Sequence, residues 1–92
     1  MAIYEGFIEE IFQEKEIGNN GFKKRDVAIR ENSPNYPQVR LFSLTKEKCL
    51  ILNNYAVGDQ VRVEFNMNGF KKESSTGNKY YNSDDIWKIE KI

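Results

Sequence analysis

Apolar and polar residues alternate along several stretches of the 92-residue chain, which is the pattern of β-strands with one buried face. The alternation is clearest over residues 22–31, 38–44 and 61–67, and a further apolar stretch, residues 80–92, contains the single tryptophan. Turn-forming residues separate these stretches. The pattern therefore predicts an all-β domain.

The first stretch, Ile3–Ile17, allows two interpretations. Its apolar residues recur at helical intervals, which fits an amphipathic helix. Gly6 and the abundance of aromatic and β-branched residues instead favour a long bent strand that shares its side chains between two layers of sheet. We expect the strand.

A short helix is expected between the third and fourth strands, over Lys46–Asn54. The Thr45 hydroxyl is placed to cap it by accepting a hydrogen bond from an early helical amide, and Cys49, Leu50 and Leu52 are expected to point inward. Three strands, a helix and two strands follow the order of the five-stranded OB-fold, a Greek-key barrel. A closed barrel also leaves no long exposed strand edge. An SH3-like or other small barrel is the alternative, but the helix position favours the OB-fold.

The composition limits the classes of function. Ninety-two residues suffice for one domain. Fourteen basic residues balance fourteen acidic ones, so any affinity for nucleic acid must come from local segregation of charge. The chain has no histidine, no Walker-type glycine loop and one cysteine, Cys49, in an apolar stretch where we expect it to pack. We therefore expect a protein that is not an enzyme and has no metal site and no cofactor.

The same features indicate where the protein acts. A lone cysteine fits a reducing compartment, and neither a long apolar run nor a secretory signal is present in the sequence. The sequence therefore predicts a cytoplasmic protein that does not interact with membranes.

The pentapeptide Asn-Gly-Phe-Lys-Lys occurs twice, at residues 20–24 and 68–72. Each copy combines a turn signal, an aromatic ring that can stack on a base, and two ammonium groups that can contact the flanking phosphates. The alternative explanation of the repeat is that two exposed hairpin ends independently contain common turn and surface residues. We expect the first copy at the end of the loop between strands one and two. The second is expected to begin a loop over residues 68–78, between strands four and five.

In OB-folds these two loops grip an oligonucleotide that lies across strands two and three. The two copies are therefore expected on the two sides of one groove, with Phe22 and Phe70 stacking on bases. Trp87 is expected in the core, and for Phe42 a place in the core competes with one in the groove. The candidate nucleic-acid-binding residues are Phe22, Lys23, Lys24, Arg25, Tyr36, Arg40, Phe42, Phe70, Lys71, Lys72, Lys79 and Tyr80.

Several short segments also carry a resemblance to a known family: residues 4–8, 21–25, 36–37 and 55–63, and the aromatic-rich end around Trp87. In these segments the chain resembles OB-fold single-stranded DNA-binding proteins, in particular short bacterial and phage ones. The resemblance implies a sequence-tolerant single-stranded DNA-binding protein that acts in replication, recombination or repair. The chain ends at its last strand, so partner recruitment through the acidic C-terminal tail of larger bacterial members is not expected.

One small domain covers only a few to about sixteen nucleotides, so several domains on one strand would bind more tightly. We therefore expect a homo-oligomer, with replication or recombination proteins as further partners. Two alternatives remain open at this stage. A small barrel could use the same aromatic loops as a protein–protein adaptor, and nothing in the sequence distinguishes single-stranded DNA from single-stranded RNA.

Overall fold

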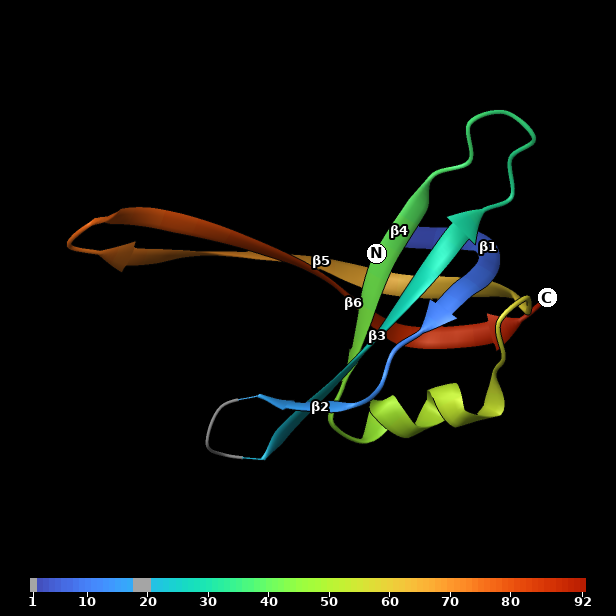
Figure 1. Cartoon of the computed structure of the whole chain (residues 1–92), viewed down its shortest axis with the longest axis horizontal. Helices are drawn as coiled ribbons and strands as arrows, with labels where there is room; N and C mark the ends of the chain where they lie inside the picture. The colour runs from blue at the N-terminus through green and yellow to red at the C-terminus, as the bar shows by residue number, and fades with distance from the viewer. Residues whose placement is uncertain (1, 18–20) are drawn as a thin grey trace.

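The computed structural model of the protein describes residues 2–17 and 21–92. The sheet order is β1-β5-β6-β4-β3-β2, and an additional pairing of β1 with β3 closes five of these strands into a ring (Figure 1). The OB-fold barrel expected from the sequence is thereby confirmed, with its helix between the third and fourth barrel strands. The elements are β1 (Ala2–Ile11), β2 (Lys15–Ile17), β3 (Phe22–Glu31), β4 (Val39–Thr45), the 3-10 helix η1 (Lys46–Asn54), β5 (Gln60–Ser74) and β6 (Gly77–Lys91).

The first stretch is a strand, as expected, but it is interrupted between β1 and β2. β1 pairs with β5 along its first half and with β3 along its second half, and Gly6 belongs to both pairings. A Cβ atom at Gly6 would overlap the carbonyl oxygen of Arg30. Glycine therefore allows the close approach at which β1 passes from one neighbour to the other.

The barrel interior is filled by aliphatic side chains around the Phe42 ring, which has no exposed surface. This ring lies 4.8 Å from the ring of Phe65 in an edge-to-face arrangement and 5.3 Å from that of Tyr4. Phe42 shares the inward face of β4 with Leu44, because side chains alternate along a strand. Its assignment to the nucleic-acid site was therefore wrong, since a buried ring cannot meet a base.

The helix differs from expectation in two respects. It is a 3-10 helix, and the side chain of Thr45 makes no capping hydrogen bond. Cys49 and Leu52 are buried, but Leu50 is 61% exposed, because a repeat of three residues per turn directs only one in three side chains inward. The Cys49 thiol donates to the Leu44 carbonyl oxygen at 3.3 Å, and burial raises its pKa. The cysteine is thus a packing residue, as expected.

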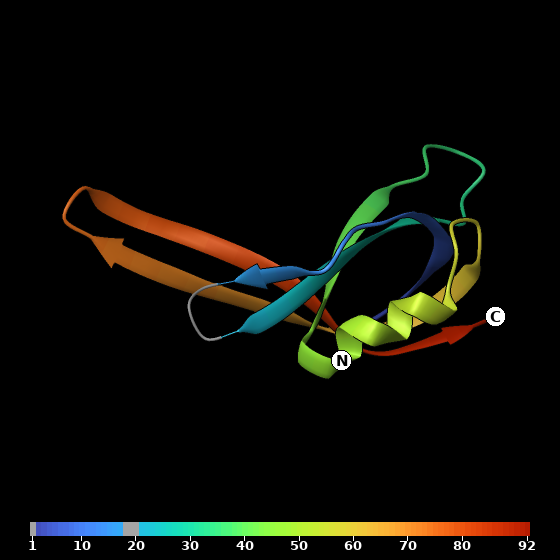
Figure 2. The ribbon, with the colours of Figure 1, turned by 60° about the horizontal axis from the view of Figure 1, so that its bottom comes forward.

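The predicted loop over residues 68–78 is wrong. β5 and β6 continue as an antiparallel pair out to Ser74 and Gly77, and this hairpin projects far beyond the barrel (Figures 1 and 2). The chain turns at Ser75-Thr76 and not at the earlier Asn68-Gly69, and the turn is followed by Gly77, whose φ of 130° suits glycine. Cross-strand side-chain pairs maintain strand structure through the Asn-Gly signal. We call residues 66–85, the part beyond the core, the arm.

Trp87 was also placed wrongly. Glu64 pairs with Lys88 while the next residue of β5, Phe65, pairs with Ile86, so Trp87 is the extra residue of a β-bulge. Ile86 stays buried, whereas Trp87 is 37% exposed. The bulge interrupts the alternation of the strand and leaves the indole at the surface.

Within the described part of the chain, no helix has the length and apolar character needed to span a membrane.

Candidate nucleic-acid interface

The arm presents two faces of different chemistry. Strand pairing sets Phe70 opposite Tyr81, Lys71 opposite Tyr80 and Lys72 opposite Lys79. Successive side chains of a strand point to opposite faces, so these pairs alternate between the two sides of the arm. We call the side with Phe70, Tyr81, Lys72 and Lys79 the Phe70 face, and the side with Lys71 and Tyr80 the Tyr80 face.

On the Phe70 face, two aromatic rings lie stacked and open to solvent. The centroids of Phe70 and Tyr81 are 5.1 Å apart, with 21° between the ring planes. Phe70 is 63% exposed and Tyr81 42%. Two nearly parallel rings held by opposite strands form a platform on which a nucleobase can stack without regard to its identity.

Two ammonium groups adjoin this platform. Lys72 and Lys79 are directly opposite each other, an arrangement of like charges that destabilises a hairpin. Neither forms an ion pair with any of the residues that the structure describes, whereas Lys71 on the Tyr80 face pairs with Glu73 at 3.2 Å. With Ser74, Thr76 and Tyr81 they border a hollow of about 170 Å³ near the tip of the arm. A bound phosphate would relieve their repulsion.

The first pentapeptide lies on the β2–β3 hairpin, and its Asn20 is outside the described residues. Phe22 begins β3 and is 38% exposed. β2 and the start of β3 lie on the same side of the barrel as the arm in both views (Figures 1 and 2). Lys23 pairs with Glu14 at 3.3 Å and Lys24 with Asp26 at 3.9 Å, so carboxylates offset both cations of this copy.

The two candidate arginines are engaged within the protein. The Arg25 guanidinium donates to the carbonyl oxygens of Phe12 and Cys49 and to Oδ1 of Asn53, and so connects β3 to the helix. The Arg40 guanidinium donates to Oδ2 of Asp84, with its Nη2 at 2.7 Å, and lies over the Phe65 ring. These contacts give both arginines structural roles. Each guanidinium keeps N–H donors beyond the ones used here, so both remain candidates for contact with phosphate.

The two remaining candidates lie away from the Phe70 face. Tyr36 is 89% exposed, but the β3–β4 loop that carries it (residues 32–38) is at the end of the molecule opposite the arm in both views (Figures 1 and 2). Tyr80 is 72% exposed and belongs to the Tyr80 face. The structure thus gathers Phe70, Lys72 and Lys79 on one face and leaves Tyr36 and Tyr80 apart from it.

Sequence reasoning expected one of the adjacent pair Tyr80 and Tyr81 to face outward without deciding which, placed Trp87 in the core, and missed Lys46. A turn at Ser75-Thr76 would have paired Tyr81 with Phe70 across the two strands, but the sequence analysis did not recognise that turn. Trp87 lies on a bulge that no local pattern marks. Both Trp87 and Lys46 border a groove of about 440 Å³ at the base of the arm.

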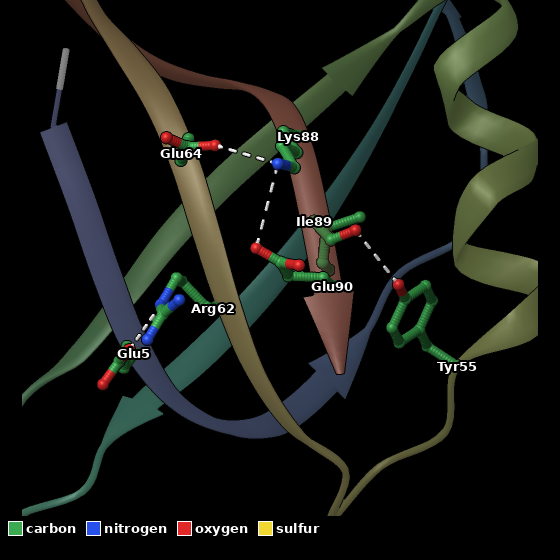
Figure 3. A network of polar contacts seen from close by, with 7 residues as sticks. All are labelled: Glu5, Tyr55, Arg62, Glu64, Lys88, Ile89 and Glu90. Atoms are coloured by element: carbon green, nitrogen blue, oxygen red, sulfur yellow. Dashed lines mark hydrogen bonds and ion pairs between the residues drawn. The ribbon is translucent and has the colours of Figure 1, made fainter. Parts of the chain in front are cut away.

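The outer face of β1, β5 and β6 is different, because its charges are paired with one another (Figure 3). Arg62 Nε lies 2.5 Å from Glu5 Oε2, and this hydrogen bond raises the pKa of the arginine further above its usual value. Lys88 Nζ lies 3.8 Å from Glu64 and 4.0 Å from Glu90. A face whose cations already have carboxylate partners attracts phosphates weakly, which separates it from the Phe70 face.

The closed ring of strands and its long arm define an OB-fold of the kind found in single-stranded DNA-binding proteins. The fold is similar to that of the mitochondrial single-stranded DNA-binding protein Rim1 of S. cerevisiae, with a TM-score of 0.75 and 18% sequence identity over 99% of this chain and 92% of that chain. The SSB domain of a Synechococcus sp. protein has a TM-score of 0.65 and 12% identity over 96% of this chain and 90% of that chain. The small single-stranded DNA-binding protein of Streptomyces coelicolor has a TM-score of 0.54 and 13% identity over 99% of this chain and 92% of that chain. At these identities the similarity establishes the shared fold.

No curated protein matches the sequence. The chain belongs to the family described as Domain of unknown function (DUF3127), whose model matches residues 4–90.

Proposed function

We propose that this protein binds single-stranded DNA without strong sequence preference. The observation that carries the proposal is the exposed Phe70–Tyr81 stack beside the opposed ammonium groups of Lys72 and Lys79. Rings and ammonium groups recognise the base planes and phosphates that every nucleotide has. The solved structures of the same fold include proteins described as single-stranded DNA-binding, which agrees with the proposal.

The role that follows is to cover exposed strands during replication, recombination or repair, without catalysis. A single arm offers a short site, so tight binding calls for several copies of the domain on one strand. We therefore propose a homo-oligomer that meets replication or recombination proteins on the DNA. Single-stranded RNA has the same bases and phosphates, and the test below includes it for that reason.

Fluorescence anisotropy with labelled poly-dT, poly-rU and duplex DNA at two salt concentrations tests the proposal. We expect poly-dT to bind more tightly than duplex. A plot of the logarithm of the binding constant against the logarithm of the salt concentration should have a negative slope of about 0.7 for each phosphate contacted. Replacing both Phe22 and Phe70 with Ala should remove most of the affinity at low salt, since each stacked ring contributes roughly 1–3 kcal/mol.

Both rings are exposed or partly exposed, so the double variant should keep the thermal unfolding midpoint of the natural protein. Equal affinity of the double variant and the natural protein for poly-dT would contradict the stacking roles. No detectable binding of any single strand would contradict the function and leave the protein–protein adaptor as the better interpretation of the same rings.

A further inference from the structure

The groove at the base of the arm has the surroundings of a second nucleotide site. Its lining includes Trp87, which is 37% exposed, and Lys46 and Lys48 of η1. Its volume of about 440 Å³ is within the range of small-ligand sites. Tryptophan supplies the largest ring for a base to stack on, and the two lysines supply cations for the adjoining phosphates.

The groove is continuous with the Phe70 face. Asn66 and Asn68 line it and lie on the same face of β5 as Phe70, at every second residue. Tyr81 and Trp87 are separated by about 20 Å along β6, at 3.2–3.4 Å per residue. About six stacked nucleotides span such a distance, at 3.4 Å each.

Lys46 also connects the groove to the first pentapeptide. It lines a second groove, of about 300 Å³, together with Gly21 and Lys23 of the β2–β3 hairpin and with Leu50. The lysine therefore stands between the two hairpins that carry the repeated pentapeptide. Its φ of 57° is a left-handed conformation that residues other than glycine rarely adopt, and such residues cluster at functional sites.

We propose that one single strand runs from the Phe70–Tyr81 stack down the arm to Trp87 and then past Lys46 to the β2–β3 hairpin. In this path Trp87 stacks on a base and Lys46 contacts the phosphate between the two grooves. The inference rests on the proposed function and deepens it, because it assigns a second stacking site and joins both pentapeptides to one ligand.

Carboxylates in the groove affect this path differently. Asp85 accepts hydrogen bonds from Nδ2 of Asn68 at 2.5 Å and from Oγ of Ser83 at 2.7 Å. These donors partly offset the negative charge of its carboxylate. Glu47 borders both grooves and forms no ion pair with the described residues. It would repel a phosphate at Lys46 and so weaken binding. Its removal offers a test in the direction of tighter binding.

Trp87 is the only tryptophan, so its fluorescence reports on this site alone. Oligothymidylates of about three and about twelve nucleotides, half and twice the span above, would be titrated into the protein. Anisotropy of the same labelled oligonucleotides would measure binding independently. We expect the longer oligonucleotide to quench Trp87 fluorescence at saturation. We also expect Phe70→Ala to weaken its binding without abolishing the quenching at saturation.

Charge variants complete the test. Lys46→Gln should weaken binding of the longer oligonucleotide by about three- to tenfold, the effect of one lost phosphate contact, and Glu47→Gln should tighten it by a similar factor. Lys88→Gln is the matched control. It makes the same change of charge next to Trp87, but Lys88 pairs with Glu64 and Glu90, so its loss should leave binding within about twofold.

The outcomes separate the two proposals. Two results would overturn the second site and leave the proposed function standing. The first is tight binding of the longer oligonucleotide with unchanged Trp87 fluorescence. The second is equal affinity of the Lys46→Gln, Glu47→Gln and Lys88→Gln proteins for this oligonucleotide. Absence of any binding to single strands would overturn both. A gain of affinity in Glu47→Gln cannot come from unfolding and would support the path directly.

Discussion

At the scale of single residues, the chemistry of a side chain and its placement separate the functional candidates from the structural ones. Phe70 and Phe42 are both phenylalanines on strands, yet one is 63% exposed and the other is fully buried. Lys72 and Lys71 are neighbours, yet among the residues that the structure describes only Lys71 has a carboxylate partner, because alternation sends the two to opposite faces of the arm. The position within the strand, rather than the residue type, decides the role.

Exchanging one ammonium group of the opposed pair tests this distinction. Lys79→Glu would place a carboxylate opposite Lys72, so we expect the free energy of unfolding of the protein to rise by about 0.2–1 kcal/mol as repulsion becomes attraction. The affinity for poly-dT should fall at least tenfold, because a phosphate would then meet a negative charge; this corresponds to about 1.4 kcal/mol. Denaturant unfolding and anisotropy measure the two effects.

Lys71→Glu is the matched control, with the same change of net charge on the Tyr80 face. Its effect on affinity should be clearly smaller. Equal losses of affinity in both variants would indicate that only the overall charge of the arm matters, and would contradict the assignment of the site to the Phe70 face.

At the scale of elements, the sequence predicted the five barrel strands and the helix position but not the extent or exact form of the elements. Periodic apolar residues identify strands that line a core, so Val61 and Val63 revealed β5. The arm has no core to face, and its Asn68-Gly69 has the composition of a turn, so a loop was expected. Cross-strand pairing and the bulge at Trp87 depend on residues of the opposite strand, which a local pattern does not contain.

The arm should be dispensable for folding and necessary for binding. The core residues nearest to it are Phe65 and Ile86, and none lies within residues 68–83. Joining Met67 to Asp84, which are paired, through an Asn-Gly turn should therefore keep the barrel and its cooperative thermal unfolding. The affinity for poly-dT should fall by two orders of magnitude or more, at roughly 1–3 kcal/mol for each stacked base that is lost.

Circular dichroism and anisotropy of the shortened protein would measure both effects. A shortened protein that folds and still binds poly-dT as tightly as the full chain would place the site elsewhere on the barrel, for example on β3 and β4. An unfolded shortened protein would show that the arm contributes to the barrel through contacts beyond its core residues, contrary to the burial pattern.

At the scale of the whole molecule, a net charge of zero hides a separation between charges that are paired and charges that have no partner within the described part of the chain. On the outer face of β1, β5 and β6, Arg62 and Lys88 pair with carboxylates (Figure 3). The arm extends the molecule to 46 Å and carries the opposed lysines away from those carboxylates. The sequence indicated that charge had to be segregated for nucleic acid to bind, but the pairing partners became clear only from the strand register.

The central claim is that one single strand lies along the Phe70 face, and mapping backbone amide shifts by NMR during titration with oligothymidylate tests it most directly. We predict that the largest shifts fall on residues 68–72 and 79–87 and on Lys46, with smaller ones around Phe22. Amides of the ion-paired face, such as those of Glu5 and Arg62, should remain unchanged. Shifts that cluster on that face or on the β3–β4 loop, with the arm unaffected, would contradict the account.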